Sequence, residues 1–561
     1  MKISFKKEIK SDDRITSEEL VELILKSRKI KNIKDFLDPP SPLTIQLSDF
    51  DKSKYKKEIS KTISLLEKIK KENQMVVVYT DYDADGITGG TILWETLHLL
   101  GFKTMPYVPH RKLEGYGFSV KGIDAVKKEF NPALIISVDH GITAKDKIMY
   151  AKSIGISVIV TDHHLKPDHI PEDAEAIFHI PALSGSGVAY FFAKMIFEHF
   201  GKTASVKQLE YNFSNDYLAL ASIGTVADLV PLVDPSRSVV KYGLEAFSKT
   251  RRVGLKQILI ESGIEGKKIT PYEIGFIIAP RINAVGRLEH AIDALRLLCT
   301  NNIEKAKQLS SHIGKMNKNR QEMMIESVEE AKKIVDEKPI PKLIILTSEK
   351  WHEGIIGLIA SRLVETYYRP TIIITKVDGF YKGSARSIKS FHITNFLREN
   401  KKYLIDVGGH QGAAGFTIDE KQLEPFINHA QKETDKLLTE KDLERIIEVD
   451  LKIPLSKITI KFVKLLEKLQ PFGIGNPQPS FLSEGILIDA KLIGKKSQHL
   501  KIYIKENESF PLELISFNHE EEFTKLTKGI PIKCIYTLSI NRWNDTERVQ
   551  GIISYIDIIK K

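Results

Sequence analysis

The sequence predicts an α/β protein in which two α/β lobes are joined by a long helix and a small β barrel is appended. Three observations predict this fold class. From Met75 onward, short β-branched segments alternate with amphipathic segments, which is typical of parallel β-α-β units. A charged helical segment at about 304–337 separates this region from a second region of the same kind. After roughly Arg445 the pattern changes to short strands with Gly and Asn turns, which indicates a small barrel.

The length and composition indicate a folded, multidomain chain. Its 561 residues exceed what one hydrophobic core organises, and we expect roughly three to five domains. Hydrophobic residues make up 42% and charged residues 28%, as in ordinary globular domains. The net charge of +10 suits a polyanionic partner such as nucleic acid. On charge alone, a Lys-rich chain with solvated faces fits equally well.

The cysteines and the first residues bear on the cellular compartment. Cys299 and Cys534 lie far apart without CxxC spacing, which argues against a disulfide framework or a zinc ribbon and fits a reducing cytoplasm. The first residues are charged and lack the apolar core of a signal peptide. No apolar run reaches the ~18 residues that a bilayer span needs. We therefore expect a cytoplasmic protein with no membrane partner.

The first elements are a helical arm followed by buried strands. Residues 1–70 are Lys-rich and helical in pattern, with a Pro-rich break at residues 39–42, and we expect a cap or an arm of unassigned role. Buried strands are expected next at residues 75–80, 133–138 and 156–161.

Each of these strands is followed at once by acidic or imidazole side chains. The three segments are Asp81-Tyr-Asp-Ala-Asp-Gly86, Asp139-His-Gly141 and Asp162-His-His164. In open parallel sheets the ligand lies beyond the carboxyl ends of the strands. We therefore expect the three segments to converge on one crevice.

The later elements form a helical region and a second α/β unit. Residues 234–338 are helical in pattern and end with the long charged helix at 304–337, which we expect to join the two lobes. The second unit is expected to contain strands at 342–346 and 371–375 around a helix at 354–367.

The segment from Asp81 to Gly86 formally matches the opening of an EF-hand calcium loop. Two features exclude that interpretation. Ile92 stands where the loop requires a bidentate Glu, and a strand precedes the segment where a helix is required. What remains is a cluster of carboxylates at the end of a strand.

The convergence of three acidic or imidazole segments predicts a metal centre. One Asp-x-Asp-x-Asp segment is more often a solvated turn, but several buried carboxylates need cations to compensate them. Mixed oxygen and imidazole ligands suit manganese or magnesium better than zinc. Asp228 adds a further carboxylate or is simply a helix-end residue. Two metals that share an Asp would activate water and stabilise the leaving oxygen of a phosphodiester, so we expect hydrolysis.

Four further segments look suited to phosphate, and in three of them Gly beside Arg, Ser or His lets amides and guanidinium groups approach phosphate oxygens. They are His110-Arg111, Pro280-Arg-Ile-Asn-Ala-Val-Gly-Arg287, Gly383-Ser-Ala-Arg386 and Gly408-Gly-His-Gln-Gly412. Each alone fits an ordinary turn about as well, but together they indicate a phosphate-rich substrate. Tyr116, Phe276 and Trp351 are candidates for stacking on bases, although such aromatic residues are more often in the core.

The motifs together resemble the DHH phosphoesterase superfamily, and more narrowly the RecJ family of exonucleases. The resemblance runs from about residue 70 to the C-terminus. Besides the strand-end segments, it rests on Leu183-Ser-Gly-Ser-Gly-Val-Ala189, Gly224-Thr-Val-Ala-Asp-Leu-Val-Pro231, the segment from Pro280 to Arg287, Trp351-His-Glu-Gly-Ile-Ile-Gly357, Gly408-Gly-His410 and Pro471-Phe-Gly-Ile-Gly-Asn-Pro477. The stretch 178–184 is shorter than the family's usual loop, and residues 1–70 match poorly.

The resemblance implies a domain organisation and an activity. The domains would be a cap (1–70), a DHH domain (71–234), a helical connector (235–338), a DHHA1 domain (339–445) and an OB-type barrel (446–561). The implied activity is processive 5′ to 3′ hydrolysis of single-stranded DNA to 5′-mononucleotides with two Mn²⁺ or Mg²⁺ ions, in recombination and repair. Single-strand-binding protein and a helicase are the implied partners, and the two-lobed plan suggests a monomer.

The resemblance also assigns residues. The implied metal ligands are Asp83, Asp85, Asp139, His163 and Asp228, with Asp81, His140 and His164 beside them as support. A 5′ phosphate would be held by Arg111, Ser384 and Arg386, with Arg281 and His410 near the strand.

Two other functions remain open at this point. Small-molecule phosphoesterases of the same superfamily lack a C-terminal barrel, so residues 446–561 discriminate against them. Inactive replication scaffolds lose the strand-end ligands, all of which are present here.

Overall fold

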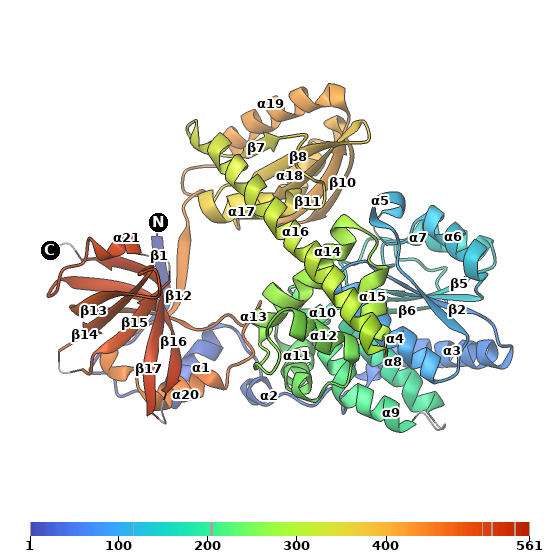
Figure 1. The fold of residues 1–561 in the computed structure, drawn as a ribbon, viewed down its shortest axis with the longest axis horizontal. Coiled ribbons are helices and arrows are strands. Elements are labelled where there is room, and N and C mark those ends of the chain that lie inside the picture. The colour runs from blue at the N-terminus through green and yellow to red at the C-terminus, as the bar shows by residue number, and fades with distance from the viewer. Residues whose placement is uncertain are drawn as a thin grey trace. The chain divides into compact units, whose positions relative to one another are not determined.

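The structure is a computed structural model that describes residues 2–115, 117–201, 206–507, 509–517, 520–543 and 546–559. The chain forms two compact units. The smaller contains Asn283–His290 and Ser311–Ile447, and the larger contains Ile3–Ile282, Ala291–Ser310 and Glu448–Lys561. Figure 1 labels the elements of both.

The first sheet of the larger unit has five parallel strands in the order β3-β2-β4-β5-β6. They are β2 (Val76–Thr80), β3 (Thr104–Tyr107), β4 (Leu134–Val138), β5 (Ser157–Asp162) and β6 (Ala176–His179). The strands β2 and β4 are apolar, rich in β-branched residues and fully buried, as expected for the interior of a parallel sheet. The three strands predicted in this region are confirmed.

Three buried helices hold the loops at the carboxyl ends of these strands. They are α4 (Ala84–Leu99), α8 (Gly185–Phe200) and α10 (Tyr217–Ala227), which pack against one another. The remaining helices around the sheet are α3 (Lys52–Lys71), α5 (Arg111–Glu114), α6 (Val120–Phe130), α7 (Lys145–Ser153) and α9 (Val206–Tyr211), with the turn η2 (Asn212–Asp216) between α9 and α10.

A helical region follows, as predicted. It comprises α11 (Asp234–Ala246), α12 (Val253–Glu261), α13 (Pro271–Glu273), the π-helical turn η4 (Ile274–Ile278), α14 (Ala279–Leu288) and α15 (Ile292–Cys299). The long helix α16 (Ile303–Asp336) has residues in both units, which confirms the predicted connecting helix.

The smaller unit contains a five-stranded sheet in the order β10-β11-β9-β8-β7. The strands are β7 (Ile344–Thr347), β8 (Thr371–Val377), β9 (Phe380–Arg386), β10 (Leu404–His410) and β11 (Ala413–Ile418). The pair β7 and β8 is parallel and the other pairs are antiparallel. The helices are α17 (Ile356–Tyr367), α18 (Ile393–Glu399) and α19 (Glu420–Leu437). The predicted strands and the helix between them are confirmed.

The C-terminal region is a closed barrel, as predicted. Its seven-stranded sheet has the order β1-β12-β13-β14-β15-β17-β16, and β13 also pairs with β16, which closes five strands into a ring. The strands are β12 (Ile446–Lys452), β13 (Ser480–Ile493), β14 (His499–Lys505), β15 (Leu512–Ser516), β16 (Pro531–Trp543) and β17 (Thr546–Ile558). Two helices, α20 (Ile460–Glu467) and α21 (Glu520–Phe523), belong to the same region.

The N-terminal segment differs from the expectation, because part of it completes the barrel core. Strand β1 (Lys2–Glu8) is the outer neighbour of β12, and the helices α1 (Ser17–Ser27) and α2 (Ile33–Leu37) contribute apolar side chains to the same core. The strand was not predicted because its residues are mostly charged and exposed, although Ile3 and Phe5 alternate with polar residues as in a strand.

Candidate metal centre and phosphate site

The acidic and imidazole side chains at the strand ends gather into three overlapping groups. In each group one ligand atom per residue lies within 4.8 Å of the others. The groups are Asp139 with His163 and His164, Asp85 with His163 and Asp228, and Asp81 with Asp83 and Asp139. The structure thus brings together the segments that follow β2, β4 and β5, and adds Asp228 at the C-terminal end of α10.

The imidazole of His163 lies at the centre of these groups. Its Nε2 atom is 3.1 Å from Oδ1 of Asp139, 3.4 Å from Oδ2 of Asp228 and 3.9 Å from Oδ2 of Asp85. Burial lowers the pKa of His163, which favours the neutral ring that metal coordination requires. One nitrogen therefore faces carboxylates from three different elements.

Backbone amides fix two of the carboxylates. Oδ1 of Asp83 accepts hydrogen bonds from the amides of Asp85 and Gly86, so Asp83 caps helix α4 through this oxygen. Both oxygens of Asp85 accept hydrogen bonds from the first amides of α8, those of Gly185 and Ser186, at 2.6 and 2.9 Å. The N-terminus of α8 thereby holds Asp85 in the centre of the site.

Asp139 is held in a backbone conformation that residues with a side chain seldom adopt. Its φ is 67°, in the left-handed region, which costs about 1–3 kcal/mol for a non-Gly residue. Gly185 makes room for it, because a Cβ atom there would lie 2.3 Å from the Cβ of Asp139. Gly224 on α10 has the same role for Asp85, whose Oδ1 would be 2.2 Å from an added Cβ. Two glycines thus let two helices approach the carboxylates.

Burial and mutual repulsion raise the pKa values of the carboxylates. The pKa of Asp139 lies well above its usual value because the group is buried and because Asp85, Asp83 and Asp81 face it. Burial and the charge of Asp85 raise the pKa of Asp228 to about 8. Together these shifts show that the folded site opposes negative charge unless cations compensate it.

The site fits divalent cations on its own geometry. The buried Oδ1 of Asp81 and Nε2 of His163 form no hydrogen bond with any described residue, although buried polar atoms are normally paired. Carboxylate oxygens with one imidazole nitrogen are donors that suit Mn²⁺ and Mg²⁺. Asp139 belongs to two of the three groups, which is the position expected of a ligand shared by two ions.

The smaller unit carries a separate arrangement suited to an anion. Arg386 at the end of β9 lies beside Ser384, with 3.3 Å between Nη1 and Oγ. Both side chains approach the first turn of α17, where a Cβ atom on Gly357 would lie 2.9 Å from Oγ of Ser384. Burial lowers the pKa of Arg386, and no carboxylate among the described residues forms an ion pair with it. A largely buried guanidinium at a helix N-terminus provides donors for phosphate.

Family models match three parts of the chain. Residues 75–225 match the DHH family N-terminal domain, residues 341–436 the DHHA1 domain, and residues 449–555 the RecJ OB domain. A single-stranded-DNA-specific exonuclease RecJ of Salmonella typhimurium is 30% identical over 522 residues, which are 89% of this chain and 90% of that protein. The chain belongs to the RecJ family.

Other RecJ proteins are also similar to this chain in sequence or in structure. The RecJ of Bacillus subtilis is 35% identical, over 86% of this chain, and the match spans 61% of that longer protein. The solved structure of RecJ from Thermus thermophilus in complex with Mn²⁺ has a TM-score of 0.81 and 26% identity, over all of this chain and 80% of that one. Among the described residues, no helix is long and apolar enough to cross a membrane.

One positioning residue of this RecJ site was missed from the sequence. Asp162 was expected to lie near the site but had no assigned role. Its Oδ1 accepts hydrogen bonds from the amides of His163 and His164 and from Nδ1 of His164, while Oδ2 accepts from the amide of Ile142. Asp162 therefore orients both histidines rather than joining a ligand group. Its position at the start of the Asp-His-His segment was the signal.

The two remaining histidines have different environments. Burial alone would lower the pKa of His164, but its hydrogen bond to Asp162 and that charge raise the pKa to about 9. His140 is in none of the three groups, since its Nε2 lies 3.1 Å from the carbonyl oxygen of Tyr79 and its ring packs against Phe118. Burial lowers the pKa of His140 to about 4, so it is neutral and supports the strand ends from behind.

The residues expected to contact the strand lie in different environments. The guanidinium of Arg111 lies over the ring of Tyr82, next to the metal centre. Arg281, in contrast, is engaged by Glu261 at 2.6 Å and by the carbonyl oxygen of Ile277. His410 is exposed at the end of β10 in the smaller unit.

The three aromatic residues considered for stacking on bases also differ from one another. Trp351 is buried, packs in a core cluster and donates its Nε1–H to Glu330, so it is not available to bases. Phe276 is exposed. Tyr116 lies outside the described residues.

Proposed function

We propose that this RecJ-family chain hydrolyses single-stranded DNA from its 5′ end to 5′-mononucleotides, with two divalent cations, Mn²⁺ or Mg²⁺. The observation that carries the proposal is the overlap of the three ligand groups at Asp139 and His163. The relatives named above act on single-stranded DNA by name, and the Thermus thermophilus structure contains Mn²⁺. The closed barrel matches the RecJ OB domain, a fold that commonly binds single strands.

The residues of the chain prepare the site for hydrolysis of a phosphodiester. Bound cations would supply an activated water and compensate the charge on the leaving oxygen. Asp83, Asp85, Asp139, His163 and Asp228 would hold them, with Asp81 beside Asp83. Asp162 keeps the histidine pair in place, and the imidazolium of His164 adds positive charge next to the position of the phosphate.

The phosphate arrangement supports action at a strand end. Ser384, Arg386 and the first turn of α17 would bind a terminal 5′ phosphate, and Arg111 would bind a phosphate at the metal centre. A terminal phosphate is found only at a strand end. Such binding would make the enzyme an exonuclease.

The wider setting is part of the same proposal. The chain would act in the cytoplasm as a monomer, in DNA recombination and repair. Single-strand-binding protein and a helicase would provide its substrate. Its domains would be 1–70, 71–234, 235–338, 339–445 and 446–561, with residues 2–37 added to the barrel as a structural partner.

End-labelled substrates test the proposal. We would incubate the protein and Mn²⁺ with single-stranded DNA labelled at the 5′ or the 3′ end, and with a blunt duplex. Immediate release of 5′-labelled mononucleotide, progressive shortening of the 3′-labelled strand and a spared duplex are expected. Cleavage of only dinucleotides or cyclic dinucleotides would replace this proposal by a small-molecule phosphoesterase.

A further inference from the structure

Two aromatic rings are stacked on the surface of the helical region. Tyr272 on α13 and Phe276 on η4 are 61% and 68% exposed. Their ring centroids are 4.9 Å apart at an interplanar angle of 28°. Large aromatic side chains normally gain stability by burial, and these two gain little. An exposed, preformed aromatic stack is typical of surfaces that bind other planar rings.

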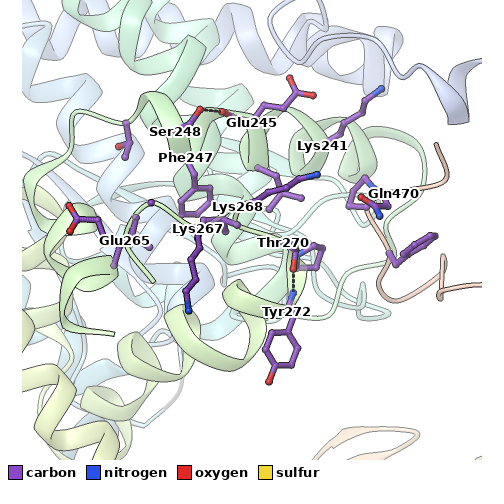
Figure 2. A pocket seen from close by; sticks show the side chains of 18 of the residues that line it. Lys241, Glu245, Phe247, Ser248, Glu265, Lys267, Lys268, Thr270, Tyr272 and Gln470 are labelled. Carbon is purple, nitrogen blue, oxygen red and sulfur yellow. Dashed lines mark hydrogen bonds between the residues drawn. The ribbon is translucent and has the colours of Figure 1, made fainter. Parts of the chain in front are cut away.

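A cavity of about 1060 Å³ lies beside the stack, and Tyr272 is part of its lining (Figure 2). Phe247, Ile269 and Phe472 give it apolar walls. Its size slightly exceeds the usual range of about 300–1,000 Å³ for small-ligand sites, so it admits a nucleotide unit.

The charged groups of the cavity favour an anion. Lys256, Lys267 and Lys268 line it and form no ion pair with any described residue, whereas Lys241 is engaged by Asp38 at 3.5 Å. Glu245 and Glu265 are the carboxylates of the lining. Three lysines without an ion pair among the described residues therefore outnumber the two carboxylates of the lining, and Lys267 and Lys268 are close in sequence to Tyr272. Phosphates beside the stack would meet these two lysines.

One wall of the cavity is fixed in advance. The buried guanidinium of Arg237 donates hydrogen bonds to the carbonyl oxygens of Gln470 and Pro471, and the first of these is 2.8 Å long. It also donates to the carbonyl oxygen of Phe36 and lies 3.9 Å from the centroid of that ring. The segment that faces Lys267 and Lys268 across the cavity is thus held before a ligand arrives, which lowers the entropic cost of binding.

The turn that carries one ring of the stack packs against a helix of the metal centre. Turn η4 packs against helix α10, and a Cβ atom on Gly275 would lie 3.8 Å from Cγ1 of Val226. Val226 is two residues from Asp228, a member of the ligand groups. Helix α10 thus carries Asp228 at its C-terminal end and contacts the turn that carries Phe276.

We propose that Tyr272, Phe276, Lys267 and Lys268 bind the part of a single DNA strand that lies beyond the nucleotide being hydrolysed. The bases stack on the two rings, and the phosphates interact with the two lysines. Every base offers a π face, so this binding does not depend on sequence. The inference rests on the proposed function, because it assigns a second binding surface to the same substrate. A protein partner fits less well, since two rings among lysines form no broad apolar patch.

Binding to strands of different length tests the inference without hydrolysis. In EDTA, we would measure the affinity of the full chain for a 5′-phosphorylated 20-mer of dT and for the dinucleotide. The double variant Tyr272→Ala/Phe276→Ala should bind the 20-mer about 30-fold more weakly, with a smaller effect on the dinucleotide. Tyr272→Phe should retain the affinity, as should Phe380→Ala, which removes an exposed ring in the other unit.

A direct optical readout complements these measurements. In Phe276→Trp the 20-mer should quench the fluorescence of the new indole by more than it changes the fluorescence of the native chain. This quenching should decrease with salt, because counterions are released when the lysines bind the phosphates. Equal affinities of wild type and double variant for the 20-mer, or no added quenching, would overturn the inference while hydrolysis by the wild type still supported the proposed function. If the wild type instead failed to hydrolyse single strands, the proposed function would fail by itself.

Discussion

The Nε2 atom of His163 lies 3.1 Å from Oδ1 of Asp139, and each of these two residues belongs to two of the three ligand groups. They come from the ends of neighbouring parallel strands, β5 and β4. A nitrogen and an oxygen from adjacent strands therefore form the centre around which the other ligands are arranged.

Replacing the shared carboxylate should abolish hydrolysis without unfolding the protein. Asn tolerates the left-handed backbone of Asp139 and removes its charge, so Asp139→Asn should reduce kcat roughly 1000-fold or more by losing a shared metal ligand. Its thermal unfolding should be unchanged or shifted upward in EDTA, since one repelling charge is gone. The exposed Asp168→Asn is the control. Full activity of Asp139→Asn with Mn²⁺ would contradict the assignment.

A methyl group added on helix α8 should distort the metal centre without replacing any of its ligands. In Gly185→Ala the added Cβ would lie 2.3 Å from the Cβ of Asp139, so either the strand end or helix α8 must move. We expect Mn²⁺ affinity to fall at least about tenfold, measured by calorimetry. Gly187→Ala is a matched control two residues along the same helix, where the nearest atom would be 3.3 Å away. Equal losses in both variants would show a general effect on α8 instead.

Asp162 should act through the histidines. In Asp162→Asn one of the two side-chain oxygens becomes an amide that cannot accept from the backbone, and the negative charge beside His164 is lost. The pKa of His164, about 9 in the native protein, should fall toward its usual value of about 6.5, as measured by NMR titration. We expect kcat/KM to fall about 10- to 100-fold. A pKa that stayed near 9 would contradict this role.

The effect of replacing Arg386 should depend on whether the strand carries a 5′ phosphate or a 5′ hydroxyl. Arg386→Gln removes the charge beside Ser384, and we expect it to weaken binding of a 5′-phosphorylated strand by about 1.5–3 kcal/mol, the usual value of a hydrogen bond to a charged group. Strands with a 5′-hydroxyl should be affected little. Lys382→Gln is the control, because this neighbouring cation on β9 is paired with Glu353. An equal loss for both substrates would contradict recognition of a terminal phosphate.

The metal-free protein should lose stability as the pH rises. The folded-state pKa values of Asp81, Asp83 and Asp139 are raised, chiefly by burial, and that of Asp228 is about 8. At these four groups the folded state binds more protons than the unfolded chain, so the stability that they contribute is fully present below about pH 4 and is lost as the pH rises toward 8. Unfolding in EDTA should show this slope.

Divalent cations should remove that dependence. A cation at a hundredfold excess over its Kd adds about 2.7 kcal/mol to the free energy of unfolding, and most strongly at high pH where the ligands are deprotonated. A metal-free protein whose stability did not fall between pH 5 and 8 would contradict the buried, mutually repelling arrangement of carboxylates.

Sequence reasoning could predict that the residues of the candidate metal centre lie together because they follow buried strands directly. Strand ends such as Thr80 to Asp81 mark both the sheet and the crevice, so both could be predicted together. The features that could not be predicted from the sequence depend on contacts between distant segments. Nothing local in the sequence shows that Glu261 engages Arg281, or that Gly185 must leave room for Asp139. Trp351 was ambiguous for the same reason, since only packing reveals that its ring is buried.

The pairing of strand β1 with strand β12 couples the two ends of the chain. Residues such as Leu20, Ile24 and Phe36 share one core with Phe462 and Phe481, more than 400 residues away in sequence. The barrel cannot complete its core during synthesis until the last segments have emerged, which makes its folding late and its contact order high. An isolated fragment of residues 446–561 would expose this apolar surface, and a peptide of residues 2–37 supplied separately should restore its solubility.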